Sequence, residues 1–434
     1  MNYRDRQILA IALPAIVTNI TVPLLGLVDT AIVGHMGAAA YIGAIAVGSM
    51  IFNLVYWVFG FLRMGTSGMT AQARGRRDIS EVIRLLMQSG LVSLRISAVL
   101  LLLQWPLCEV MLSIISPTPD VRLLAASYFY IVVWGAPASL GLFALTGWFI
   151  GMQNTRIPMF ISIMQNVVNI LASLILVYCF GMKVEGVAWG TLIAQYAGLL
   201  TAVVLLFKYY SRLWHSHYVS LDSGLVSFTA FFHVNRDIFF RTLFLVVVNL
   251  YFTSAGARQG AIILAVNTLL MQLYLFFSYV MDGFAFAGEA LGGRLWGARN
   301  WIAYHEVVRR LFVWGTGMVA AFTAVYVLGG MPFLRLLTDE AGVVEASRSY
   351  VWWAYLIPVA GVAAFVWDGI FIGTTQTRGM LISSFMAAVV FFISVILLMP
   401  KIENHGLWLS MILYLLMRGL VQTVIYFRKR TPAY

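Results

Sequence analysis

Long apolar runs alternate with short polar turns along the whole chain. Each run holds about 20 residues, enough for a helix to cross the roughly 30 Å hydrocarbon layer of a bilayer. Charged, glycine-containing or proline-containing turns separate the runs. The pattern predicts an all-α membrane protein with twelve spans, near residues 8–34, 43–65, 82–104, 122–147, 157–181, 186–210, 238–256, 260–286, 307–330, 348–372, 380–400 and 406–427.

The two halves of this pattern repeat each other. Matching segments recur at one offset of 222 residues, always at corresponding loops: Gly75–Asp78 with Gly297–Asn300, and Phe149–Arg156 with Phe371–Arg378. A shared offset of this kind indicates internal duplication. We therefore expect two six-helix lobes, 1–212 and 237–434, related by a pseudo-two-fold axis along the membrane normal, with 213–236 as the cytoplasmic connection.

Composition supports a membrane protein and fixes its expected orientation. Hydrophobic residues make up 61% of the chain and charged residues 10%, against roughly 25% charged in soluble domains. By our span limits, eighteen of the 28 lysines and arginines lie on one side and six on the other, while four, including Arg241 and Arg418, fall inside spans or at their edges. The positive-inside rule then places both termini in the cytoplasm, at the plasma (inner) membrane. The net charge of +11 needs no nucleic-acid partner to explain it.

One carboxyl group stands alone in the first span. Asp29 is the only ionisable side chain from Ile8 to Val33. Such groups are costly in hydrocarbon, so they usually face a protein interior or a wet cavity, often on an ion or proton path. Burial disfavours the charged form, which would make Asp29 a proton carrier at cellular pH. The alternative is an acid buried for packing and hydrogen-bonded to a neighbouring helix.

Polar side chains at helical spacing mark the faces expected to line a cavity. The fifth span carries the stripe Ser162, Asn166, Asn169 and Ser173. Thr18 precedes Asp29 by eleven residues and shares its helix face. These amides and hydroxyls can hydrogen-bond a protonated Asp29 or donate oxygens to Na⁺ when it is ionised, so we expect a coupling-ion site here. Asn53 and Tyr56 form a similar stripe on the second span. Polar stripes also serve as glue between helices, and that alternative stays open.

The second half has its own polar face. Tyr274, Ser278 and Asp282 share one side of the eighth span, and Asp368 lies in the tenth span near its cytoplasmic end. We expect these residues to shape the substrate cavity or its inner gate. The structural alternative is that the two acids form ion pairs with Arg63, Arg294 or Arg378.

Two prolines mark where the first span could bend. Pro14 and Pro23 each remove a backbone hydrogen bond, so the helix between and beyond them is locally weakened. We predict that they act as hinges through which protonation of Asp29 bends or straightens the helix. Fixed kinks without switching are the alternative.

The sequence lacks patterns typical of an intramembrane enzyme. It contains no HExxH and no paired aspartate-rich diphosphate motif, and the segment Gly65–Gly68 is not GxSxG. We therefore expect neither catalysis nor a cofactor, and no metal site other than Na⁺ at Asp29. A channel remains a further alternative, because a lone acid could line a pore.

Several segments together resemble the multidrug and toxic compound extrusion (MATE) transporters, in particular the branch related to DNA-damage-inducible protein F. They are Leu27–His35, Gly60–Ala73, Asp282–Phe284 and Asp368–Gly373. The resemblance covers essentially the whole chain. It implies a twelve-helix, two-lobed antiporter that expels lipophilic, mostly cationic organic compounds in exchange for H⁺ or Na⁺.

The resemblance also assigns roles to residues. The coupling-ion aspartate of the family maps onto Asp29, its early proline onto Pro14, and its fifth-span asparagine onto Asn169 or Asn166. Some relatives carry a second acid on that span, where this chain has Ser173. This departure favours a one-ion mechanism and speaks against a carboxylate-rich Na⁺ site.

We therefore expect a monomeric antiporter, coupled to H⁺, that binds a small organic substrate and a coupling cation within the lipid bilayer and works by alternating access. The rival transporter is a flippase or exporter of a lipid-linked or amphiphilic anionic molecule. Against it, the cavity candidates are poor in the arginine that recognition of a phosphate group favours.

Overall fold

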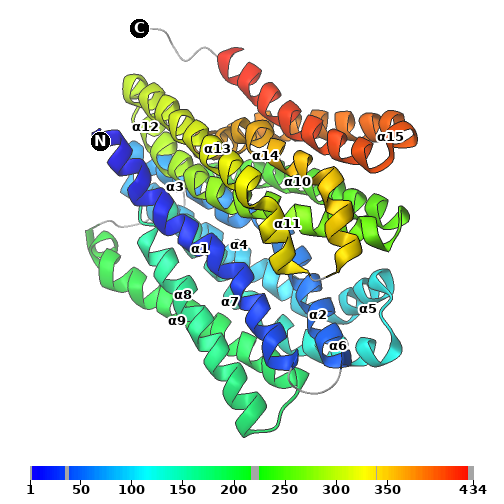
Figure 1. Cartoon of the computed structure of the whole chain (residues 1–434). Helices are drawn as coiled ribbons and strands as arrows, with labels where there is room; N and C mark the ends of the chain where they lie inside the picture. Colours follow the sequence, from blue (N-terminus) through cyan, green and yellow to red (C-terminus); the bar gives the residue numbers. More distant parts are fainter. Residues whose placement is uncertain (1, 35–38, 217–223, 339, 429–434) are drawn as a thin grey trace. The chain divides into compact units, whose positions relative to one another are not determined.

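The computed structural model describes residues 2–34, 39–216, 224–338 and 340–428, which fold almost entirely into helices without a strand (Figure 1). Ten helical segments in these ranges are long and apolar enough to cross a membrane. One of the ten, α15, contains the last two predicted spans, and the 32-residue helix α1 covers the first. The prediction of twelve helical spans is confirmed.

In the first half the helices are α1 (Tyr3–Gly34), α2 (Ala39–Val58), α3 (Phe61–Gly75), α4 (Ile79–Leu102), α5 (Gln104–Ile115), α6 (Pro119–Val132), α7 (Ala136–Gly151), α8 (Arg156–Leu174) and α9 (Val184–Ser216). In the second half they are α10 (Gly224–Arg258), α11 (Ala261–Ala287), α12 (Gly293–Gly297), α13 (Trp301–Leu337), α14 (Ala341–Gly373) and α15 (Thr377–Arg428). A 3₁₀ turn, η1 (Val133–Gly135), and two π-helical turns, η2 (Ile175–Cys179) and η4 (Gly288–Gly292), join neighbouring helices.

Some spans are less regular than the sequence suggests. The second predicted span comprises α2 and α3, which meet at Gly60. In α15 the backbone leaves the helical conformation at Ile402 and Glu403, where the two last spans are joined. The expected connection 213–236 includes residues 217–223, which lie outside the described part of the chain.

The chain divides into two compact units. The first-half unit is Val17–Phe231, and the second-half unit combines Met1–Ile16 with Phe232–Tyr434. The division falls inside α1, so the N-terminal part of this helix belongs with the second half of the sequence. It also falls between Pro14 and Pro23, and α1 is helical through both positions.

The duplication is visible in the backbone. Arg77 and Arg299, 222 residues apart, both adopt positive φ angles, of 61° and 55°. Each is followed by a helix N-cap side chain, Asp78 accepting from the amide of Glu81 and Asn300 from that of Ala303. Matching positions therefore end one helix and begin the next in the same way.

Glycines repeat the packing of these helices at the same offset. In the first-half unit a Cβ on Gly151 would lie 2.7 Å from the carbonyl oxygen of Ser67, on α3. In the second-half unit a Cβ on Gly373 would lie 2.6 Å from the carbonyl oxygen of Glu289. Only glycine permits this approach, so α7 against α3 and α14 against the end of α11 are equivalent contacts.

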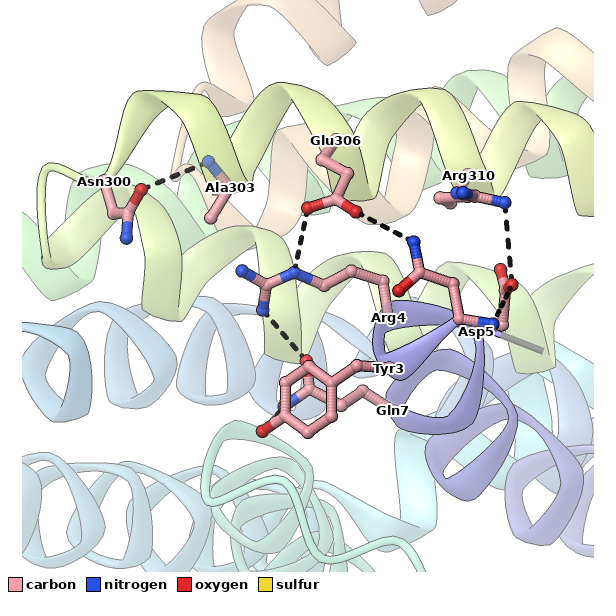
Figure 2. Close-up of polar contacts among 9 residues, drawn as sticks. Tyr3, Arg4, Asp5, Gln7, Asn300, Ala303, Glu306 and Arg310 are labelled. Atoms are coloured by element: carbon pink, nitrogen blue, oxygen red, sulfur yellow. Dashed lines mark hydrogen bonds and ion pairs between the residues drawn. The ribbon is translucent and has the colours of Figure 1, made fainter.

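Polar contacts attach the start of α1 to α13, as Figure 2 shows. Arg4 forms an ion pair with Glu306 at 3.2 Å, and Asp5 pairs with Arg310 at 3.5 Å. Asp5 also accepts a hydrogen bond from the indole of Trp314 at 3.2 Å. Burial raises the pKa of Asp5, but these hydrogen bonds and the charge of Arg310 outweigh it and hold the pKa below its ordinary value.

A buried amide network fixes the bend in α15. Asn267 of α11 and Asn404, the first residue after the non-helical pair, exchange two amide hydrogen bonds of 2.8 and 2.9 Å. The indole of Trp408 donates to the same Asn267 oxygen at 2.8 Å. Because every partner is buried and bonded, this network stabilises the bend.

Candidate functional site

Asp29 lies near the end of α1 and is only 5% exposed. Its Oδ1 has no hydrogen-bond partner among the described residues, and none of the ion pairs in this part of the chain involves it. The buried Tyr128 of α6 is close enough to interact with it electrostatically. Asp29 is thus a buried carboxyl group without a basic partner, as its solitary position in the span predicted.

Neutral polar groups surround this acid. Tyr128 reaches Thr191 of α9, which accepts a hydrogen bond of 3.0 Å from the amide of Asn169 on α8. Asn169 and Ser173 are fully buried, and neither Oδ1 of Asn169 nor Oγ of Ser173 has a partner among the described residues. We call Asp29, Tyr128, Asn169, Ser173 and Thr191 the first-half polar cluster. It combines one acid with unpaired neutral oxygens, which suits a proton or a small cation.

The rest of the predicted stripe holds α8 against α1. Asn166 donates to the backbone oxygen of Thr21 at 2.9 Å, and the hydroxyl of Ser162 bonds that of Thr21 at 2.9 Å. Thr21 also donates to the carbonyl of Thr18 at 2.7 Å. The two helices therefore meet along the predicted faces. Because the amide of Asn166 is used for packing, Asn169 is the asparagine that offers an open oxygen near Asp29.

The second-span residues lie apart from these contacts. Asn53 is exposed on α2. The ring of Tyr56, one turn later, packs on Phe52 at 5.7 Å and edge-on to Phe143 at 6.4 Å between centroids. The side chain of Pro23 lies outside the described part of the structure, and Pro14 is half-buried in α1.

A second polar group is buried in the second-half unit. Arg241 of α10 and Arg418 of α15 both form ion pairs with Oδ2 of Asp368 on α14, the latter at 2.6 Å. Gln422, one turn after Arg418, donates to Oδ1 of Asp368 at 2.6 Å. All four side chains are buried, Asp368 being the most exposed at 7%. We call these four residues the second-half charged cluster.

This arrangement corrects two expectations from the sequence. Asp368 pairs with Arg241 and Arg418, and not with Arg63, Arg294 or Arg378. The interior is also richer in arginine than its predicted cavity residues suggested, because Arg241 and Arg418 are 5% and 3% exposed. The argument against an anionic substrate therefore loses its basis.

The other predicted residues of this half lie on α11. Tyr274 is close enough to Arg418, Tyr414, Asp282 and Asp368 to interact with them electrostatically. Asp282 and Ser278 are half-buried on the same helix. The structure thus joins Tyr274 to the charged cluster.

Sequence reasoning missed five of the residues in the two clusters. Arg241 and Arg418 carried a usable signal, since a charge inside an apolar span requires a partner. Gln422 follows Arg418 by four residues and so shares its helix face. Tyr128 and Thr191 carried no comparable signal, because single tyrosines and threonines are common in membrane helices.

Comparisons with known proteins agree with this architecture. The family model MatE matches residues 14–175 and 238–397. DNA damage-inducible protein F of Escherichia coli (strain K12) is 36% identical over 424 residues, covering 98% of this chain and 92% of that protein. Protein DETOXIFICATION 44, chloroplastic, of Arabidopsis thaliana is 25% identical over 437 residues, covering 95% and 80%.

Solved structures share the fold at low sequence identity. A structure described as MATE in the bent conformation matches with a TM-score of 0.86 and 18% identity, covering 98% of this chain and 96% of that one. An outward-facing multidrug resistance MATE family transporter matches with a TM-score of 0.88 and 16% identity, covering 99% and 98%. At these identities the likeness shows the fold alone, a twelve-helix arrangement in two lobes.

Proposed function

Because the chain belongs to the MATE family of efflux transporters, we propose that it is an antiporter that exports lipophilic, mostly cationic organic compounds in exchange for protons. The family makes it a multi-pass membrane transporter and not an enzyme. We place it in the plasma membrane as a monomer with both termini in the cytoplasm, following the excess of lysine and arginine on one side.

The environment of Asp29 supports proton coupling. A buried carboxylate without a cation is unfavourable, so the site stabilises either the protonated acid or a bound cation. The open oxygens of Asn169 and Ser173 can accept from a protonated carboxyl or help to coordinate Na⁺. With one acid in the first-half polar cluster, a single exchanged ion per cycle is expected, and H⁺ is the simpler occupant.

Exchange then follows from competition for one site. The outward-facing state takes up H⁺ at Asp29 and releases the substrate, and the inward-facing state loses the proton and loads substrate. Each ligand must favour a different state, because a ligand with equal affinity for both shifts nothing. Proton entry also gains roughly 2.3 kcal/mol per 100 mV of membrane potential. Pro14 and Pro23 are the proposed hinges, since the boundary between the two units falls between them in α1.

The substrate-facing residues are assigned by type. We propose that Asn53, Tyr56, Tyr274 and Ser278 contact substrate, and that Asp282 and Asp368 shape the inner gate. Aromatic rings suit a lipophilic cation through cation–π attraction, and the chain's 20 methionines offer soft, adaptable packing.

Transport by reconstituted vesicles tests the assignment. Efflux of tetraphenylphosphonium would be measured under an imposed pH gradient or an imposed Na⁺ gradient, with wild type beside Asp29→Asn. We expect the pH gradient to drive transport in wild type and the variant to lose about two orders of magnitude, as for removal of an essential proton carrier. Asp120→Asn, a change at an exposed acid, is the control.

Two other outcomes separate the alternatives. If Na⁺ alone drives transport, the antiporter stands but proton coupling is wrong. If neither gradient moves the cation, the flippase or exporter of an anionic amphiphile takes its place, which Arg241 and Arg418 favour. Vesicles that translocate a fluorescent lipid-linked phosphate would then support that function.

A further inference from the structure

The second-half charged cluster carries one more positive than negative charge. Arg241 and Arg418 are both cationic, because arginine stays protonated in proteins, and Asp368 supplies a single carboxylate. The nearest acid along α10, Asp237, pairs with Arg236 at 3.2 Å. Uncompensated charge is unfavourable in a buried setting, so the cluster favours a further anionic group.

Both arginines also have a donor without an acceptor. The Nε groups of Arg241 and Arg418 are buried and have no hydrogen-bond partner among the described residues. Buried N–H groups in native proteins are nearly always paired with protein, water or ligand. A guanidinium group presents a planar fork of donors that matches the oxygens of a carboxylate, sulfonate or phosphate. These two open donors therefore have the chemistry of an anion site.

Aromatic groups lie beside the arginines. The guanidinium of Arg418 lies over the ring of Tyr414, with Cζ 5.7 Å from the ring centroid. The Tyr414 hydroxyl is buried without a partner among the described residues and could donate to an anionic oxygen. Tyr274 interacts electrostatically with Arg418, and its ring lies 6.4 Å from that of Phe365. The rings offer an apolar surface for the body of a ligand with an acidic head group.

We propose that Arg241 and Arg418 bind the carboxylate, sulfonate or phosphate head group of an amphiphilic ligand. Asp368 is the internal counter-ion that holds both arginines when the ligand is absent, and the ligand competes with it for their N–H groups. Binding stands independently of coupling at Asp29, whereas transport of the bound anion rests on the proposed function. The same chemistry suits a free amphiphile or an anionic phospholipid.

Matched probes test the site on the purified full-length protein in neutral detergent. Binding of pyrenebutyrate would be followed by energy transfer from the chain's 13 tryptophans, with the uncharged pyrenebutanamide as the comparison. We expect the carboxylate to bind at least about tenfold more tightly than the amide, the size typical of a charge-assisted hydrogen bond. Equal affinities would overturn the proposal, and no ion gradient enters the measurement.

Variants distinguish binding from a purely structural role. Arg241→Gln should lose about tenfold in carboxylate affinity with no change for the amide, while Arg122→Gln, an exposed arginine paired with Glu109, should change neither. Asp368→Asn should tighten carboxylate binding several-fold, because it removes the competing acid. A structural role alone predicts that Arg241→Gln and Asp368→Asn weaken both probes together, which would contradict the site.

Two further measurements cover instability and the ligand's source. If Asp368→Asn does not yield folded protein, Arg418→Lys keeps the charge but not the fork and should still lose carboxylate selectivity; unchanged selectivity would argue against the site. Adding phosphatidylglycerol to the micelles identifies the source. Displacement of the dye supports a lipid head group as ligand, and retention of the dye supports a free amphiphile.

Discussion

Asp29 in the first-half unit and Asp368 in the second-half unit are both buried acids on helices of a duplicated fold, but their neighbours differ. Asp29 has neutral polar neighbours and an Oδ1 without a partner among the described residues. Asp368 accepts from two arginines and a glutamine. The first acid remains available to an exchanged ion, whereas the second is neutralised by permanent cations.

The difference shows that duplication preserved the backbone and not the polar chemistry. The offset of 222 residues that relates Gly151 to Gly373 pairs Asp368 with Thr146. The Thr146 hydroxyl bonds the carbonyl of Leu142 in its own helix at 2.7 Å, so it needs no charged partner. Helix ends and glycine contacts repeat because they set the fold, while each half has its own side chains at its centre.

The same substitution at the two acids should have opposite consequences, and the larger is at Asp368. Asp368→Asn leaves Arg241 and Arg418 buried without a counter-ion, and removing one partner of a buried pair typically costs about 3–5 kcal/mol. The free energy of unfolding in mixed micelles would be measured by denaturant titration. Arg241→Gln should cost less, because Asp368 keeps Arg418; a greater loss in Arg241→Gln would contradict this description of the cluster.

Two buried asparagines extend the comparison from acids to amides. Asn267→Ala removes the partner of both Asn404 and Trp408 and should cost about 2–4 kcal/mol of stability, from two buried polar groups left unpaired. Asn169→Ala removes one hydrogen bond, to Thr191, and should cost about 1 kcal/mol while reducing gradient-driven transport. Thermal unfolding and vesicle transport of both variants check this contrast, which fails if the stability losses are equal.

Asp29→Asn should change stability by less than about 1 kcal/mol, or raise it, because no buried cation is left unpaired. Its unfolding curve would be compared with that of wild type at neutral pH in detergent. A loss comparable to that of Asp368→Asn would show that Asp29 has a structural ion pair, and the contrast between the two acids would no longer hold.

The smallest effect is expected at Asp5, the paired acid at the other end of α1. Its pKa is lowered in the folded state, so its stabilising contribution is present above the unfolded-state pKa, roughly 4, and is lost as pH falls through the folded-state value. Wild type should therefore lose stability relative to Asp5→Asn as the pH is lowered from 5 to 3. Parallel melting temperatures over this range would contradict the contacts with Arg310 and Trp314.

Apolar period and repeat offset carried most of the fold in the sequence. Span length follows from bilayer thickness, so twelve helices and their duplication could be predicted without contacts. Asp29 was identified because a single charge in an apolar span stands out. The charged cluster was missed because Asp368 meets partners 127 and 50 residues away, and span patterns do not specify which helices adjoin. The different uses of Asn166 and Asn169 depend on helix rotation, which spacing alone does not fix.

Proton release on substrate binding tests the central claim most directly. Tetraphenylphosphonium would be added to purified protein in weakly buffered detergent near pH 7, and the pH change converted to protons released per cation bound. Competition at Asp29 predicts release of up to one proton in wild type and in Arg241→Gln, and none in Asp29→Asn. Cation binding without proton release in wild type, or equal release from Asp29→Asn, would contradict Asp29 as the site of exchange.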